Sequence, residues 1–84
     1  MPHLKEEFIQ TVGGVLWDRT SPEFPCIEFL RLVQHVVEAE PQASAGAVQD
    51  ALLVLEKRTL AYLPEGITEG AEICRTDRGE FVRQ

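Results

Sequence analysis

The chain has 84 residues, 44% hydrophobic and 26% charged, which is the composition of an ordinary folded domain and excludes a wholly disordered chain. A formal charge of −6 excludes long-range attraction to nucleic acid, because such binding depends on neutralising phosphates. No apolar run approaches the roughly 20 residues that span a bilayer, which excludes a membrane-spanning protein. The start of the chain lacks the basic and then apolar order of a secretory signal, so the predicted location is cytoplasmic. We expect one domain over residues 1–84, with a thin core.

The first predicted element is a helix over about residues 3–12, where apolar side chains recur at helical spacing. Each residue of the pair Gly13-Gly14 costs about 1 kcal/mol relative to alanine inside a helix. The helix can therefore end there and leave residues 15–17 extended, and the sequence leaves both conformations open. Trp17, the only tryptophan, is interpreted as an anchor in the core or toward a partner.

The second predicted helix follows a loop over residues 18–25, and it begins beside Pro22 or Pro25 because proline fits a first helical turn. It is expected to end near Glu38 or Ala39, before Pro41. Its polar side carries His35, interpreted as a solvated histidine. Its apolar stripe contains Cys26, Phe29, Leu30, Val33, Val36 and Val37.

The third predicted helix begins after Ser44, whose hydroxyl can accept a hydrogen bond from a free backbone N–H of the first turn. It runs to about Arg58, with an apolar half centred on Leu52. Leu53 breaks this pattern, because it falls in the middle of the polar half. Two interpretations stay open for it: an ordinary exposed leucine, or a contact with a partner or with the first helix.

Two strand-like segments, residues 59–63 and 71–76, follow the third helix and are joined by a loop with turn residues at both ends. They predict a β-hairpin with a long tip. A short helical turn is expected over residues 78–83. The predicted fold class is therefore α+β: three helices, a C-terminal hairpin and a short terminal turn.

The two cysteines, Cys26 and Cys74, lie far apart in a chain without a secretory signal, which favours buried free thiols over a disulfide. Together with His3 and His35 they would provide four ligands, the number that a zinc site needs. No two of these four residues lie at the short sequence spacing typical of such sites. No catalytic or phosphate-binding motif occurs, and the acidic pairs lie at ends or in loops. We therefore predict no metal, no cofactor and no catalysis.

Three helices followed by a hairpin is the element order of a winged helix, and two segments also resemble that family. Residues 55–62, LEKRTLAY, resemble the end of a recognition helix that passes into the first wing strand. Residues 74–82, CRTDRGEFV, resemble the second wing strand and following turn of MarR-like and PadR-like regulators. The resemblance covers about residues 26–84. It implies a winged-helix domain whose third helix and wing contact DNA.

The residues at those positions depart from the family's pattern. The third helix would present Gln49, Leu53 and Lys57, with Gly46 and Asp50, where such regulators place basic and small polar side chains. The wing tip carries two acidic residues, Glu65 and Glu69, where the family often has Arg or Lys. Basic residues gather only near the hairpin base, where they form a strip or stay scattered in solvent: Lys57, Arg58, Arg75, Arg78 and Arg83.

The predicted function is that of a non-catalytic winged-helix module which acts by protein contact, as a regulator or adaptor of a nucleic-acid machine. Its contact centre would be Gln49, Leu53 and Lys57, with Trp17 or Tyr62 as an aromatic anchor. 

The alternative function is a DNA-binding transcriptional regulator that forms a homodimer through its first helix. Gln49 and Lys57 would then enter the groove, and a local basic strip of Arg58, Arg75 and Arg78 would contact phosphates, or an acidic partner. An acidic mimic of nucleic acid is a minor third alternative.

Overall fold

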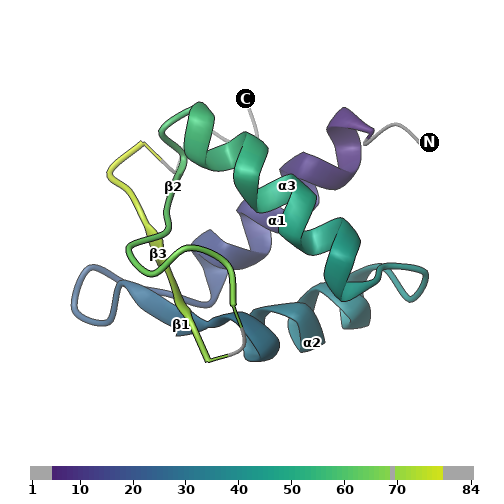
Figure 1. Cartoon of the computed structure of the whole chain (residues 1–84), viewed down its shortest axis with the longest axis horizontal. Helices are drawn as coiled ribbons and strands as arrows, with labels where there is room; N and C mark the ends of the chain where they lie inside the picture. The colour runs from purple at the N-terminus through teal and green to yellow at the C-terminus, as the bar shows by residue number, and fades with distance from the viewer. Residues whose placement is uncertain (1–4, 69, 79–84) are drawn as a thin grey trace.

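The computed structural model describes residues 5–68 and 70–78, and it has the predicted α+β fold (Figure 1). The elements in chain order are α1 (Glu6–Asp18), β1 (Cys26–Glu28), α2 (Phe29–Ala39), α3 (Ala45–Lys57), β2 (Ala61–Tyr62) and β3 (Glu72–Arg75). The strands form one antiparallel sheet in the order β1-β3-β2, so β2 and β3 make the predicted hairpin. Three helices and this sheet are compatible with a winged-helix-like fold. Among the described residues, no helix has the length and apolar composition needed to cross a membrane.

Helix α1 runs without a break through Gly13-Gly14 to Asp18, so the extended alternative for residues 15–17 is wrong. Both glycines are buried, so at this point the backbone of α1 itself packs against the rest of the protein. Val12 and Leu16 on either side are almost fully enclosed in the core. Their burial offsets the intrinsic cost of about 1 kcal/mol per glycine.

The second helix begins at Phe29, later than predicted, because residues 26–28 form strand β1. Backbone hydrogen bonds fix β1 against β3: Arg75 N donates to Pro25 O over 2.8 Å, and Phe29 N donates to Ala71 O over 2.8 Å. The helix ends at Ala39, as predicted. Its buried stripe is formed by Phe29, Leu32 and Val36, whereas Leu30, which was expected in the stripe, is 39% exposed.

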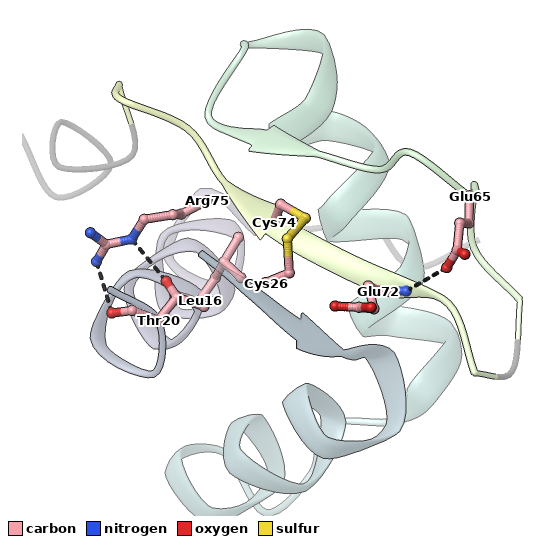
Figure 2. The surroundings of a disulfide bond; sticks show 7 residues. All are labelled: Leu16, Thr20, Cys26, Glu65, Glu72, Cys74 and Arg75. Carbon is pink, nitrogen blue, oxygen red and sulfur yellow. Dashed lines mark hydrogen bonds between the residues drawn. A yellow bond between two sulfur atoms is a disulfide. The ribbon is translucent and has the colours of Figure 1, made fainter. Parts of the chain in front are cut away.

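Cys26 and Cys74 form a disulfide between β1 and β3, so the prediction of free thiols is wrong (Figure 2). The two residues are direct partners in the strand register. The hydrogen bonds of the ladder join residues 25 with 75 and 29 with 71, which places this pair at a position without ladder hydrogen bonds. Side chains approach closest at such positions, and here the two Cα atoms are 3.9 Å apart. Disulfides are more typical of oxidising compartments, so the bond weighs against the cytoplasmic location, which stays a prediction.

Helix α3 begins as predicted, with Ser44 Oγ accepting a hydrogen bond from Ala47 N at 3.1 Å. At its other end Thr59 N donates to Glu56 O and Leu60 N donates to Leu55 O, which is the hydrogen-bond pattern of a Schellman motif. Thr59 holds the left-handed position of this motif with φ 60°, where glycine is usual. Leu60 consequently turns back onto the core.

The core lies where the three helices meet one face of the sheet. Its fully enclosed large side chains come from α1, α2, α3 and β3: Leu16, Leu32, Leu52, Leu55, Ile73, Val12, Val36 and Val48. In Figure 1, α3 crosses in front of α1, α2 lies below, and the sheet lies on the left. The expected helical turn over residues 78–83 lies outside the described residues, apart from Arg78.

Candidate functional site

The outward row of α3, formed by Gln49, Leu53 and Lys57, lies on one exposed side of the helix as predicted. The three side chains are four residues apart, which places them one above the other on a helix. Leu53 is 43% exposed although the opposite side of α3 supplies four fully buried residues. The structure therefore brings the three predicted contact residues together, with an apolar side chain at their centre.

Acidic side chains surround this row. Asp50 and Glu56 are also exposed on α3, and Lys57 is the only basic residue of the helix, so the helix carries a formal charge of −1. A helix that reads DNA bases usually presents arginine, lysine or amide groups to the major groove. The α3 row offers one amide and one lysine around a leucine. These side chains suit contact with a protein better than hydrogen bonding to the edges of DNA bases.

Arg58 lies directly after α3 and forms a two-pronged ion pair with Glu6 at the start of α1. Nη1 donates to Glu6 Oε2 over 2.6 Å, and Nη2 donates to Oε1 over 2.8 Å. These hydrogen bonds, more than the charge of the guanidinium, lower the pKa of Glu6 from its ordinary value. Arg58 is therefore engaged in holding the end of α3 against the start of α1.

We expect this pair to make stability depend on pH in the acid range. A carboxyl group with a lowered pKa in the folded state stabilises the fold above its unfolded pKa, and this contribution is lost as the pH falls through the folded value. Urea unfolding should show that Glu6→Gln is less stable than the wild type at neutral pH, and that the difference disappears in acid. Added salt should reduce it, because both side chains are exposed.

Glu7→Gln is the matched control for this prediction, since Glu7 is an exposed acid in the same first turn of α1. Both changes remove a negative charge that interacts favourably with the helix N-terminus. Equal losses in the two variants would show that the helix end, and not Arg58, accounts for the effect.

Arg75, another predicted phosphate contact, is half-buried against the C-terminal end of α1 (Figure 2). Its Nε donates to Thr20 Oγ1 over 2.9 Å, and its Nη2 donates to Trp17 O and Thr20 O over 2.6 and 3.0 Å. The guanidinium carbon also lies 3.5 Å from the centre of the Trp17 ring, a cation–π contact. Trp17 and Arg75 therefore fasten β3 to α1.

The other predicted contact residues lie apart from the α3 row. Arg78 is exposed in the turn after β3, and Tyr62 on the edge strand β2 is 57% exposed. Glu65 in the hairpin loop accepts a hydrogen bond from Glu72 N at 3.1 Å and so supports the hairpin itself. Glu69 and Arg83 lie outside the described residues. The roles of Arg58, Arg75 and Arg78 toward a partner stay predictions, and the first two already have partners within the chain.

A basic cleft, which the sequence did not reveal, lies between the end of α1, β1 and α2. It has a volume of about 560 Å³ and is lined by Arg19, Phe24, residues 26–28, Arg31 and His35. The sequence predicted Arg19 in the loop over residues 18–25 and Glu28, Arg31 and His35 on the polar side of the second helix, and no local pattern indicated that the two segments face one cleft. The packing of α1 against α2 and the pairing of β1 with β3, about 45 positions along the chain, bring these segments together.

Metal binding finds no support in the part of the chain that the structure describes. No group of three or more His, Cys, Asp and Glu side chains is arranged there to hold an ion. The disulfide engages both cysteines of the set that was considered for zinc.

The chain was compared with protein-family models, with curated proteins and with solved structures, and none of the three comparisons gave a match. Its function must therefore be argued from its own residues.

Proposed function

We propose that this domain is a non-catalytic winged-helix module of the MarR or PadR type that binds a protein partner through the outward row of α3. It would serve as a regulator or adaptor of a nucleic-acid machine, the setting in which winged-helix domains are common. The partner would offer an apolar depression to Leu53, with hydrogen-bonding and acidic groups beside it for Gln49 and Lys57.

The observation that carries the proposal is the exposed Leu53 at the centre of the α3 row. A half-exposed leucine buries additional apolar area when a partner covers it, at roughly 25 cal/mol per Å². Centres of protein interfaces are depleted of charge and surrounded by a polar rim. Gln49, Lys57 and Asp50 around Leu53 have that arrangement.

Replacement of Leu53 by glutamate should weaken partner binding by about tenfold or more, because it places a charge at an apolar contact. A photo-crosslinking amino acid at position 53, introduced into the full chain in its native cells, would identify the partner. Binding of the purified partner to the wild type and to Leu53→Glu would then be measured by calorimetry. Thermal unfolding should be nearly unchanged, since the side chain already contacts solvent.

Leu30→Glu is the matched control, because Leu30 on α2 is exposed to nearly the same degree as Leu53, 39% against 43%. Its variant should bind the partner as the wild type does. If both variants bind equally well, or both lose binding equally, the α3 row is not the contact surface.

The DNA-binding alternative predicts a different result in a salt titration. A DNA-binding dimer that places Arg58, Arg75 and Arg78 on phosphates should bind duplex DNA at low salt and lose affinity steeply as salt rises. We expect no saturable binding to mixed-sequence duplex, because the α3 row has a net negative surrounding and two of these arginines are engaged within the chain. Tight, salt-sensitive binding that Lys57→Gln abolishes would favour the alternative over protein contact.

A further inference from the structure

We propose that the basic cleft binds a small organic oxyanion, a phosphate or carboxylate group attached to an aromatic ring. The cleft shares no residue with the α3 row, so this inference does not depend on the proposed protein contact. Four features of the described residues support it: arginines without an ion-pair partner, an exposed aromatic side chain, a rigid wall, and a buried nitrogen without a hydrogen-bond partner.

The charge of the cleft is opposite to that of the chain. Arg19 and Arg31 both line it, against one carboxylate from Glu28, in a chain with a formal charge of −6. Neither guanidinium has an ion-pair partner within residues 5–68 and 70–78, whereas Arg58 and Arg75 are engaged. A guanidinium presents paired N–H donors in the geometry that a carboxylate or phosphate accepts, so two of them facing one cleft favour an oxyanion.

The size of the cleft and the exposure of Phe24 indicate that the anion carries a ring. A volume of about 560 Å³ lies within the range of small-molecule sites, roughly 300–1,000 Å³, and a bare phosphate would leave most of it empty. The Phe24 side chain is 75% exposed, the highest value among the large hydrophobic residues described. A ring placed against it would cover apolar surface that now contacts water.

Hydrogen bonds and the disulfide hold the wall of the cleft in place before any ligand arrives. Ser21 N donates to Phe24 O over 3.1 Å, and Phe24 N donates to Ser21 Oγ over 3.1 Å, so this exposed turn is closed from both sides. The bond from Cys26 to Cys74 fixes the start of β1 to β3. A preformed wall reduces the entropy that is lost when a ligand binds.

His35 and Arg19 line both the basic cleft and a second, smaller cleft of about 370 Å³, whose other charged residues, Asp18 and Glu38, are acidic, so the anion is assigned to the basic cleft alone. Its Nδ1 is enclosed and has no hydrogen-bond partner among the described residues, with the nearest carboxylate oxygen, Oε2 of Glu38, at 3.7 Å. Buried polar atoms are nearly always satisfied by protein, water or a bound group. This nitrogen, beside Glu38 of the smaller cleft, is the kind of atom that an ordered water or a ligand satisfies.

The test is a two-dimensional NMR titration of the full chain with four probes: phenyl phosphate, benzoate, inorganic phosphate and phenol. Phenyl phosphate or benzoate should shift the Nε–Hε signals of Arg19 and Arg31, and the amide signals of residues 21–31, in a saturable way. Either one should bind about tenfold or more tightly than inorganic phosphate and phenol, because only these two carry both charge and ring. Which of the two binds more tightly distinguishes a phosphate ester from a carboxylate as the natural ligand.

Two variants and a control keep the test specific. Arg31→Gln and Phe24→Ser should each lower the affinity for the tighter-binding probe by about tenfold, and each variant should otherwise keep the wild-type NMR spectrum. Arg78→Gln removes an exposed arginine outside the cleft and should leave the affinity as it is. Absence of saturable shifts with every probe, or equal weakening by Arg78→Gln and Arg31→Gln, would overturn the proposal.

Discussion

Removal of the Cys26–Cys74 disulfide is expected to lower the free energy of unfolding by about 4 kcal/mol. The bond closes a loop with a sequence separation of 48 residues, and in the chain-entropy model a loop of this length restricts the unfolded chain by about that amount. Small domains are typically stable by only 5–15 kcal/mol, so this one bond contributes a large share of the total. Urea unfolding of the oxidised wild type and of the double variant Cys26→Ala/Cys74→Ala measures the difference.

The effect should act mainly on the unfolded state. Without the disulfide, β1 is still joined to β3 by the hydrogen bonds on either side of the cysteine pair, so the folded protein should keep nearly the same amide spectrum. The dependence of unfolding on urea should become steeper, because the unfolded chain expands further. Mass spectrometry after alkylation of the unreduced, unfolded protein provides the control and should find no modified cysteine. A stability loss below about 1 kcal/mol would contradict the prediction.

The elements that the sequence predicted correctly are those whose evidence is local. Helix α3 was predicted with its N-terminus and its exposed row, because Ser44 and the helical spacing of apolar residues lie within the helix itself. The same spacing placed Gln49, Leu53 and Lys57 on one side, and the structure confirms that arrangement. The hairpin followed from two short strand-like segments with turn residues between them.

The incorrect predictions share a different cause, since their evidence lies elsewhere in the chain. Residues 26–28 continue the helical pattern of α2 locally, and only the pairing with β3 makes them a strand. Once the register is known, Cys74 lies directly opposite Cys26, and the disulfide follows. The basic cleft has a similar cause, because Arg19 follows α1 and Arg31 lies on α2, and only the packing of these two helices places both arginines beside it.

The like-charged pair Glu28 and Glu72 is an unfavourable contact between β1 and β3. These residues face each other two positions from the disulfide, on the same side of the sheet, and like charges directly opposite weaken a strand pair. β1 is only three residues long, so few ladder hydrogen bonds oppose this repulsion. The disulfide joins β1 to β3 two positions from this repulsion and so opposes it, and β1 is also the strand that lines the basic cleft.

Replacement of Arg75 by glutamine is expected to lower the free energy of unfolding by about 2–3 kcal/mol, because it removes charged hydrogen bonds and a cation–π contact together. The last carbonyl groups of a helix have no partner within it, and the end of α1 relies on two side chains instead. Thr20 Oγ1 donates to Leu16 O over 2.6 Å, while Arg75 donates to Trp17 O and to Thr20. A positive charge is also favourable at this end of a helix.

Arg75→Lys and Arg78→Gln test whether the geometry of Arg75 or only its charge matters. Lysine keeps the charge but cannot supply the planar set of donors or stack on Trp17 in the same way. The free energy of unfolding of Arg75→Lys should therefore lie between those of the wild type and Arg75→Gln. Arg78→Gln changes the net charge as Arg75→Gln does, at an exposed position, and should stay within about 0.5 kcal/mol of the wild type. Trp17 fluorescence should change in Arg75→Gln and Arg75→Lys but not in Arg78→Gln, since only the first two remove the guanidinium that lies 3.5 Å from the centre of the Trp17 ring. Equal stability of the two glutamine variants would show that β3 is held to α1 by the apolar core and not by Arg75.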